Sequence, residues 1–408
     1  MRRVAVTGMG GVSALGSDWP RIEERLRGGA NAVRYMSEWE RFTDLGSKLA
    51  APIGDFEPPA HWTRKQTRSM GRVSQLAVAS AENALRDAGL LGATLLGEGN
   101  AGVACGSSVG SIPDTKDFAV MLLEGASPGL NANSYVRMMP HTAAANISIF
   151  FGLKGRIIPT SSACTSGSQA IGYAYESIRQ GAQTVMLAGG ADELCATQAM
   201  SFDILCAASR RNGEPGATPR PYDRDRDGLV VGEGAAILVL EDFEHARARE
   251  ARIHAEIVGF ATNCDGTHVT RPVEGTMRVV QELALRDAQL PASAVGYVNA
   301  HGTGTEQGDI AESRATAAAL GSGVPFSTQK SYLGHTLGAC GALEAWFSIA
   351  MMNAGWFAPT LNLEHLDPRC GELDYIAGTG RTLEAEYVMS NNFAFGGVNT
   401  SLLFRRAR

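Results

Sequence analysis

Short apolar segments alternate with amphipathic segments along nearly the whole chain, and this alternation limits the possible fold more than any other feature. Short apolar runs indicate strands, and longer runs with one apolar face indicate helices. The expected strands span residues 4–7, 101–106, 184–190, 235–241, 256–260, 295–300, 387–390 and 400–404. The expected helices span residues 72–88, 168–179, 276–288, 308–320 and 336–352. This order predicts an α/β fold with a mostly parallel sheet and helices on its faces.

Each half of the chain contains a strand, then a turn rich in glycine, serine and threonine, then a helix. Cys164 lies in such a turn in the first half, and His301 lies in such a turn in the second. The first strand is expected to end at the glycine-rich residues 8–11. The polar segment 210–228 is rich in turn-forming residues, so we expect a surface loop there and not a linker. The pattern indicates weak internal symmetry without a domain boundary.

The composition is that of a globular protein with a large core, since 44% of the 408 residues are hydrophobic. The formal net charge of -6 gives no reason to expect nucleic acid as a partner. None of the 7 cysteines forms a Cys-x-x-Cys pair, which argues against a disulfide framework or a zinc site and fits a reducing compartment. We see no signal-peptide pattern and no apolar run that could span a bilayer, so we expect a cytoplasmic protein.

Cys164 has the most informative surroundings of these cysteines, within Ser-Ser-Ala-Cys-Thr-Ser-Gly at residues 161–167. A strand-like piece precedes it and a helix-like piece follows, so the thiol should face the positive end of a helix dipole. That position favours the thiolate, a nucleophile that forms a thioester when it attacks an activated carbonyl. Most isolated cysteines fill the core, however, so this turn alone does not define a function.

Two histidines in the second half strengthen the case for chemistry. His301 opens His-Gly-Thr-Gly-Thr after an expected strand, and His335 lies at the start of the last expected helix. At a helix start the dipole disfavours protonation, which leaves a neutral imidazole able to donate a hydrogen bond. Taken singly, each histidine is more often structural than catalytic, and Glu312 with Lys330 would be an ordinary ion pair.

Taken together, these segments resemble the β-ketoacyl-acyl-carrier-protein synthases, the elongating branch of the thiolase-like condensing enzymes. The resemblance covers essentially the whole chain and is carried by several motifs in the family's order. These are Val-Thr-Gly-Met-Gly at 6–10, Ser-Ala-Cys-Thr-Ser-Gly at 162–167, Gly-Glu-Gly-Ala at 232–235, His-Gly-Thr-Gly-Thr at 301–305, Gly-His-Thr-Leu-Gly-Ala at 334–339 and Asn-Phe-Ala-Phe-Gly-Gly-Val-Asn at 392–399. Residues 61–72 also resemble a segment of relatives that make aryl polyenes or other polyketides.

The resemblance implies a five-layer α-β-α-β-α fold of two similar halves. Residues 1–250 would carry the nucleophilic cysteine, and residues 251–408 would carry the two histidines. It also implies a homodimer, or a heterodimer with a chain-length partner. The phosphopantetheine group would arrive on the acyl carrier protein, so we expect no resident cofactor and no metal in the site.

The resemblance also implies catalytic roles at matching positions. Cys164 would take an acyl group from the carrier protein, and His301 and His335 would stabilise the enolate formed as malonyl-carrier protein loses carbon dioxide. The backbone N–H groups of Cys164 and Phe395 would form an oxyanion hole, where donors face developing negative charge. Lys330, paired with Glu312, would support the histidines.

Further positions match substrate and carrier contacts. Thr270, Thr303 and Thr305 would contact the pantetheine arm, with Phe393 nearby. Residues expected in the acyl pocket are Val109, Phe202 and Leu229. The local basic cluster expected to dock the carrier protein, or alternatively to form a solvated helix face, comprises Arg64, Lys65, Arg68 and Arg72.

The chain departs from the family pattern at four positions. Glu306 stands where proline is usual, Leu229 where an aromatic residue is common, Ala394 where glycine is usual and Val398 where threonine is usual. Alanine in place of glycine is expected to stiffen the loop that carries Phe395. These departures leave the length and shape of the acyl group open, and with them the choice between fatty acid and polyketide synthesis.

Two alternatives to a stand-alone elongating synthase remain. One is another acyltransferase of the thiolase superfamily, either a thiolase or an initiating synthase. Two observations argue against this alternative: two histidines are present, and Cys340 is expected in the core. The other is a non-catalytic chain-length partner of an active synthase. Such partners usually lack the cysteine, whereas Cys164, His301, His335 and Lys330 are all present here.

Overall fold

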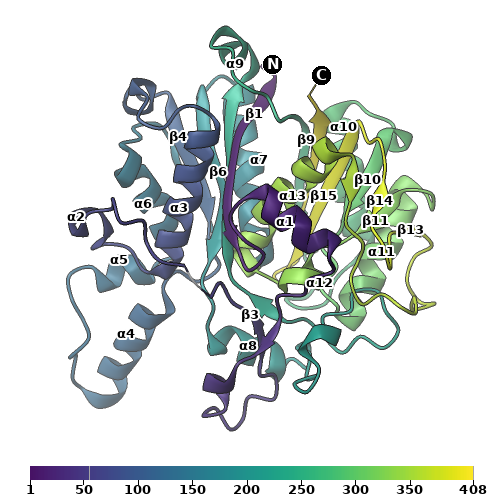
Figure 1. The fold of residues 1–408 in the computed structure, drawn as a ribbon, viewed down its shortest axis with the longest axis horizontal. Helices are drawn as coiled ribbons and strands as arrows, with labels where there is room; N and C mark the ends of the chain where they lie inside the picture. Colours follow the sequence, from purple (N-terminus) through teal and green to yellow (C-terminus); the bar gives the residue numbers. More distant parts are fainter. Residues whose placement is uncertain (55, 408) are drawn as a thin grey trace.

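The computed structural model describes residues 1–54 and 56–407, and two units of the same construction dominate it (Figure 1). The strands of the first unit are β1 (Val4–Ser13), β4 (Ala101–Gly106), β5 (Ile157–Thr160), β6 (Val185–Asp192) and β8 (Gly234–Asp242). Its main helices are α3 (Arg72–Asp87), α6 (Thr142–Phe151) and α7 (Ser166–Arg179). The strands of the second unit are β9 (Ala255–Cys264), β10 (Val295–Asn299), β11 (Pro325–Ser327), β15 (Tyr387–Ala394) and β16 (Val398–Arg406). Its main helices are α10 (Glu274–Ala288), α11 (Glu306–Leu320) and α13 (Cys340–Ala354).

The remaining elements lie in the connecting segments and at the sheet edge. They are α1 (Trp19–Arg27), β2 (Arg34–Tyr35), β3 (Leu49–Ala51), α2 (Arg64–Thr67), α4 (Ile112–Glu124), α5 (Ser134–Met138), α8 (Ala196–Ile204), β7 (Val231–Gly232), α9 (Phe243–Ala248), α12 (Lys330–Leu333), β12 (Trp356–Phe357), β13 (Asp374–Tyr375) and β14 (Arg381–Thr382). None of the helices formed by the described residues is long and apolar enough to cross a membrane.

The two units have the same strand order. The first sheet runs β5-β4-β6-β8-β1, and the second runs β11-β10-β15-β16-β9. If the five strands of each unit are numbered in chain order, both sheets have the order 3-2-4-5-1. A short antiparallel pairing of Val4–Val6 with residues 255–257 joins the sheets at their first strands. The chain therefore repeats one topology twice, although no short sequence repeat marks it.

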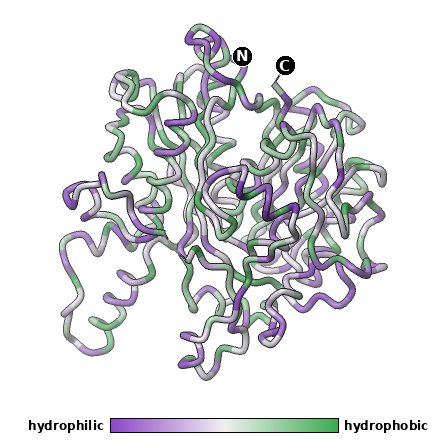
Figure 2. Tube along the Cα trace, viewed as in Figure 1, coloured by the Kyte–Doolittle hydropathy of each residue, from purple (hydrophilic) through white to green (hydrophobic). Residues whose placement is uncertain are grey.

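Helices cover both sheets and also fill the space between them. In Figure 1, α3 and α6 cover the outer face of the first sheet, α10 and α11 lie on the outer side of the second, and α7 and α13 lie between. The core between the sheets includes Ile178 of α7 and Leu343 and Phe347 of α13. Two further cores lie beneath α3 and beneath α10. Figure 2 shows hydrophobic residues gathered on these inner elements and hydrophilic ones on α1 and the outer loops. The five-layer α-β-α-β-α prediction is confirmed.

The expectation of a mostly parallel sheet is wrong. Within the large sheet, parallel pairing is confined to β4, β5 and β6 in the first unit and to β10, β11, β13 and β15 in the second. The pairings of β8, β1, β9 and β16 with their neighbours are antiparallel. In the second unit β15 and β16 are joined directly by a tight turn, and antiparallel strands need no crossover helix.

The glycines of residues 8–11 do not end the first strand, because β1 continues to Ser13. A Cβ atom on Gly8 would lie 2.3 Å from the Ala84 carbonyl oxygen, and one on Gly10 would lie 2.4 Å from the Ala84 nitrogen. These glycines therefore let the backbone of α3 approach the strand closely, and such close approach is a common reason for glycine inside a strand.

Segment 210–228 is only partly a surface loop. Its first part is largely exposed, but residues 218–223 are buried and Arg226 is buried too. The Tyr222 hydroxyl donates a hydrogen bond to Glu312 at 2.9 Å, so this part of the segment belongs to the interior beside the second unit. The polar composition of this segment led to the prediction of a surface loop. Sequence alone does not show that these polar groups have hydrogen-bond partners in the interior.

Candidate active site

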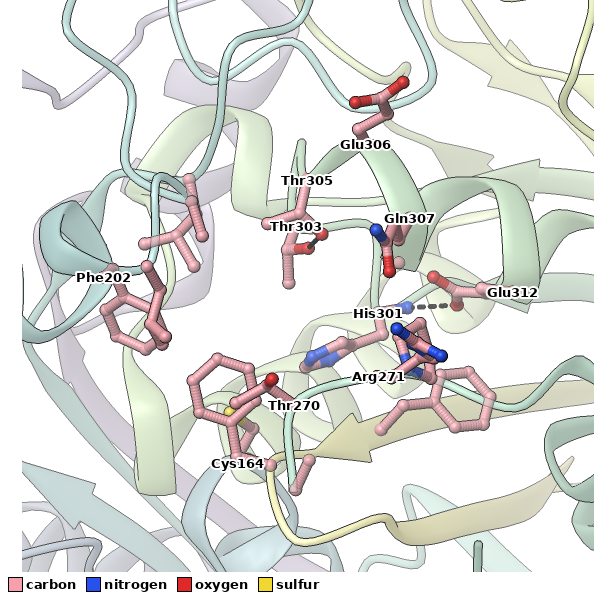
Figure 3. A pocket seen from close by; sticks show the side chains of 18 of the residues that line it. Cys164, Phe202, Thr270, Arg271, His301, Thr303, Thr305, Glu306, Gln307 and Glu312 are labelled. Atoms are coloured by element: carbon pink, nitrogen blue, oxygen red, sulfur yellow. Dashed lines mark hydrogen bonds between the residues drawn. The ribbon is translucent and has the colours of Figure 1, made fainter. Parts of the chain in front are cut away.

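Cys164 lies in a sharp turn between β5 and α7 and lines a cavity of about 380 Å³ (Figure 3). Ala163 has a φ of 50°, in the left-handed region that residues other than glycine rarely adopt. The Ser166 hydroxyl holds the turn, since it accepts from the Ser162 N–H at 2.9 Å and donates to the Ala163 carbonyl at 2.7 Å. The turn leaves Cys164 only 6% exposed.

His335 lies next to the thiol, with its Nε2 atom 2.9 Å from Cys164 Sγ. Its backbone is fixed on both sides: its N–H donates to the Val230 carbonyl at 2.7 Å, and its carbonyl accepts from Gly232 at 2.9 Å. The Leu337 N–H donates to Nδ1 at 3.3 Å, so the ring proton is on Nε2 and points to the sulfur. Burial and the nearby Lys330 charge hold the pKa of His335 well below its usual value, so the imidazole is neutral.

His301 follows β10 and approaches His335 edge-on, with ring centroids 5.2 Å apart. Its Nδ1 atom accepts from Lys330 Nζ at 3.1 Å and lies 3.4 Å from Asn392 Nδ2. Both neighbours are donors, so the ring proton of His301 is also on Nε2. Burial, together with Lys330 and His335, holds the pKa of His301 well below its usual value. The site thus contains two neutral imidazoles that each present an Nε2–H donor.

The predicted ion pair of Lys330 with Glu312 is wrong. Lys330 Nζ pairs with Glu344 of α13, and both side chains are almost fully buried. Burial alone would lower the pKa of Lys330, but Glu344, together with Cys340 and Glu312, outweighs it and raises that pKa above the usual value. The second Glu344 oxygen accepts from Asn392 Nδ2 at 2.6 Å. Lys330, Glu344 and Asn392 therefore form one buried network behind His301.

Glu312 instead fixes the backbone that carries His301. Its carboxylate accepts from the His301 N–H at 2.6 Å (Figure 3). It also accepts from the Gly302 N–H at 2.8 Å and from the Tyr222 hydroxyl. Burial raises the pKa of Glu312 to about 7, and the two backbone donors oppose that rise. Glu312 acts on the position of the histidine and not on its ring.

The expectation that Cys164 is a thiolate at rest is not met. Burial raises the pKa of its thiol to about 11, against the opposing effects of Lys330 and of the backbone N–H groups of Phe395 and Cys164. The loss of solvation therefore raises the pKa of the thiol more than the position at a helix start lowers it. The two N–H groups that face the sulfur are the same two predicted to form the oxyanion hole.

The cavity brings together most of the predicted substrate contacts. Thr303 and Thr305 share a hydrogen bond at 2.9 Å (Figure 3). The Phe202 and Phe395 rings lie 5.4 Å apart and line the same cavity as the thiol. The predicted contacts that line the cavity are Phe202, Leu229, Thr270, Thr303, Thr305, Phe393 and Phe395. Val109 does not line it, and its side chain is 37% exposed on the surface of this chain.

Sequence reasoning missed several residues of the site. Glu344 lies in the expected helix 336–352 and was given no role, although a carboxylate in so apolar a segment is itself a signal of a buried partner. Asn392 was part of the glycine-rich motif but received no role. Tyr222 was placed in a surface loop. Arg271 also lines the cavity, directly after Thr270, and was not singled out.

The side chains of Cys164, His301 and His335 have the spacing of a metal site, since one ligand atom from each lies within 4.8 Å of the others. The hydrogen bonds around the rings oppose metal binding. A histidine that ligates a metal through Nε2 donates its Nδ1–H to an acceptor, whereas both Nδ1 atoms here face donors. The arrangement suits hydrogen-bond donation into the cavity.

The predicted docking cluster is divided. Arg64 and Lys65 of α2 and the neighbouring Arg68 are exposed. Arg72, by contrast, makes two hydrogen bonds to the buried Glu233, at 2.8 and 2.9 Å, and one to the Ile53 carbonyl. Arg72 is therefore a structural ion-pair partner, and its inclusion as a free surface cation was wrong.

Comparison with known families agrees with this geometry. Residues 1–246 match the family described as "Beta-ketoacyl synthase, N-terminal domain", and residues 254–364 match "Beta-ketoacyl synthase, C-terminal domain". The chain belongs to the β-ketoacyl synthase family, and the resemblance seen in the sequence is confirmed.

Individual relatives cover the full length of the chain. A protein of Vibrio harveyi named "3-oxoacyl-[acyl-carrier-protein] synthase 2" is 38% identical and covers 99% of each chain. The crystal structure of a β-ketoacyl synthase from Burkholderia phymatum is 60% identical with a TM-score of 0.99, covering 100% of both chains. A structure titled "The ishigamide ketosynthase/chain length factor" is 32% identical with a TM-score of 0.91, again covering 100% of both chains.

Proposed function

We propose that this chain is a β-ketoacyl-acyl-carrier-protein synthase, which condenses an acyl group held on Cys164 with malonyl-acyl carrier protein. One observation carries the proposal: the Cys164 thiol and a ring nitrogen of each of His301 and His335 converge within 4.8 Å in one buried pocket. The names of the family and of its full-length relatives support the reaction class.

The first step transfers the acyl group. Cys164 Sγ attacks the thioester carbonyl of the acyl carrier protein, the carbon–sulfur bond to the carrier breaks, and the carrier leaves with the thiol proton. The N–H groups of Cys164 and Phe395 lie at the sulfur, and we assign them to the oxygen of the tetrahedral intermediate. These two donors oppose, without cancelling, the loss of solvation that keeps the resting thiol protonated.

The second step forms the carbon–carbon bond. Malonyl-carrier protein loses carbon dioxide, and the resulting enolate oxygen accepts hydrogen bonds from the Nε2–H groups of His301 and His335. The enolate carbon attacks the acyl carbonyl, the bond to Cys164 Sγ breaks, and the thiolate takes up a proton. The products are a 3-oxoacyl-carrier protein, carbon dioxide and the free carrier from the first step.

Neutral imidazoles suit this role. Burial and the Lys330 charge keep both rings unprotonated at neutral pH, so each can donate from Nε2 without becoming an acid that would quench the carbanion. Lys330 and Glu312 position His301 from two sides, the ring and the backbone. Phe395 lies beside the thiol and gates access to it, and Ala394 next to it limits how far that loop can open.

The proposed assembly follows from the same reaction. Acyl carrier protein delivers both substrates on phosphopantetheine, and the exposed Arg64, Lys65 and Arg68 dock its acidic surface. The active form is a homodimer, or a heterodimer with a chain-length partner. Residues 1–250 and 251–408 form the two halves, and Val109 belongs to the acyl pocket once the dimer is complete. We place the protein in the cytoplasm, in keeping with 7 free cysteines.

Intact-mass measurement tests the proposal directly. The protein and Cys164→Ala are each mixed with acyl-carrier substrates of several lengths, and then malonyl-carrier protein is added. We expect an acyl mass on the unsubstituted protein, none on the variant, and 3-oxoacyl-carrier product after the addition. Absence of loading from every carrier, with the protein folded, would overturn the stand-alone synthase and favour a chain-length partner.

A further inference from the structure

Arg271 differs from every other charged side chain in the cavity lining. Arg226 pairs with Asp367 at 2.7 Å, Glu306 with Arg369 at 2.5 Å, and Asp227 with Arg211 at 3.5 Å. Asp265 accepts from Asn399 at 2.7 Å, and Glu312 accepts from the backbone N–H groups of His301 and Gly302. Within residues 1–54 and 56–407, the Arg271 guanidinium has neither a hydrogen-bond partner nor an ion-pair partner, so its five donors are free.

The backbone around Arg271 is held in place although its side chain is free. The Val269 carbonyl accepts from the Gly396 N–H at 2.7 Å, and the Asp265 N–H donates to the Gly397 carbonyl at 2.8 Å. These bonds tie the segment of Arg271 to the turn that follows Phe395. Figure 3 shows Arg271 among the lining side chains, with Gln307 and Glu312 on the same side of the cavity.

Arg271 also lies at the solvent end of the cavity. It is exposed, whereas Cys164, His301 and His335 at the other end are buried. Arg271 and the buried thiol line the same cavity, so a thioester that fills the cavity also occupies the part lined by Arg271. The charge of a free guanidinium and its planar set of donors suit an oxyanion, phosphate or carboxylate, more than any neutral group.

We propose that Arg271 binds an anionic group of the incoming thioester at the entrance of the cavity. The inference rests on the proposed function. Two anions are available in that reaction, the phosphate of the phosphopantetheine arm and the carboxylate of the malonyl unit. The position favours the phosphate, because the malonyl carboxylate leaves as carbon dioxide beside the buried histidines.

Substrates without the carrier protein separate this contact from docking on α2. Four thioesters are compared: acyl-pantetheine, acyl-phosphopantetheine, malonyl-pantetheine and malonyl-phosphopantetheine. Acyl transfer to Cys164 is followed by intact mass, and condensation by carbon dioxide release from enzyme loaded in advance. The variants are Arg271→Gln, Arg271→Lys and Arg286→Gln, the last an exposed arginine of α10 that does not line the cavity.

We expect Arg271→Gln to lower kcat/KM about three- to tenfold for both phosphorylated thioesters, mainly through KM, because water screens an exposed charge. The two pantetheine substrates should be unaffected, Arg271→Lys should recover part of the loss, and Arg286→Gln should change nothing. A loss limited to the malonyl substrates, with or without phosphate, would support the anion contact but identify the carboxylate as its ligand.

Two results would overturn the inference. One is an equal loss on all four substrates, including uncharged acyl-pantetheine, which would show a structural role. The other is no loss on any of them. Failure of the proposed function is a separate outcome, since the unsubstituted protein would then acquire no acyl mass on Cys164 from any thioester.

Discussion

The turns that open α7 and α13 occupy equivalent places in the two units, yet only one of them carries a nucleophile. Each follows the third strand of its unit, and each contains a residue with positive φ, Ala163 at 50° and Leu337 at 51°. The next residue is Cys164 in the first turn and Gly338 in the second. The same backbone geometry therefore serves two purposes, and the side chain that follows the strained residue decides which.

The surroundings of Gly338 explain why that turn cannot carry a side chain. A Cβ atom there would lie 2.7 Å from Asp192 Oδ2 and 2.8 Å from the Ser108 nitrogen. The Gly338 N–H donates to Asp192 at 2.6 Å, so the second turn is anchored to the end of β6 in the first unit. This anchor fixes His335 three residues earlier, directly opposite Cys164. One turn supplies the nucleophile, and the other supplies a donor held against it.

The largest expected effect comes from removing the nucleophile. Cys164→Ala should abolish acyl loading and lower condensation by more than about 10³-fold, since Cys164 carries the thiol that lies beside His335 in the cavity. Condensation rate and the melting temperature of the variant check this together. An active Cys164→Ala protein would contradict the claim that the turn before α7 carries the nucleophile.

Removing the donor of the second turn should have the next largest effect. His335→Ala is expected to lower condensation about 10²–10³-fold, the usual cost of one preorganised donor to developing negative charge. Acyl loading of Cys164 should fall less, because the Phe395 and Cys164 N–H groups remain. Equal losses in loading and condensation would contradict a role for His335 at the enolate.

The packing of the second turn gives a prediction about stability. Gly338→Ala should lower the free energy of unfolding by about 1–3 kcal/mol, because the added methyl group has no space beside Asp192 and Ser108. Gly323→Ala is the matched control: its Cβ meets no atom within 4 Å, so the change should stay below about 1 kcal/mol. Urea denaturation of both variants checks this, and equal stabilities would refute the steric account.

The buried thiol predicts an unusual pH dependence of alkylation. Burial raises the pKa of Cys164 to about 11, so its thiolate fraction at neutral pH is smaller than that of an ordinary cysteine. The rate of Cys164 alkylation by iodoacetamide should therefore rise about tenfold per pH unit from pH 7 to 10 without levelling off. The exposed Cys206, measured by peptide mapping of the same samples, is the control. A plateau near pH 8.5 for Cys164 would show a thiol with an ordinary pKa.

The sequence predicted much of this arrangement because its signals are local. Cys164, His301 and His335 each stand in a short run of small residues next to a strand or a helix, so both their existence and their approximate placement follow from neighbouring residues. The two-unit fold was likewise expected from family motifs that cover the whole chain.

The errors concern relations between distant segments. Lys330 pairs with Glu344 and not Glu312, and which carboxylate it meets depends on how α12 and α13 pack. The sequence pattern paired the Cys164 turn with the His301 turn. In the structure its equivalent is the turn at Leu337 and Gly338, which follows the next strand of the second unit after the one that precedes His301. The low pKa expected for Cys164 neglected its burial, which only the folded chain determines.

Mapping the acyl adduct tests the central claim, that one of two equivalent turns is the reactive one. The protein is loaded with one equivalent of acyl-carrier substrate, digested, and all 7 cysteine-containing positions are compared by mass. The account predicts a single thioester on Cys164, with Cys340 of α13 and the exposed Cys206 unmodified. A thioester on Cys340 or Cys206 in place of Cys164 would contradict it.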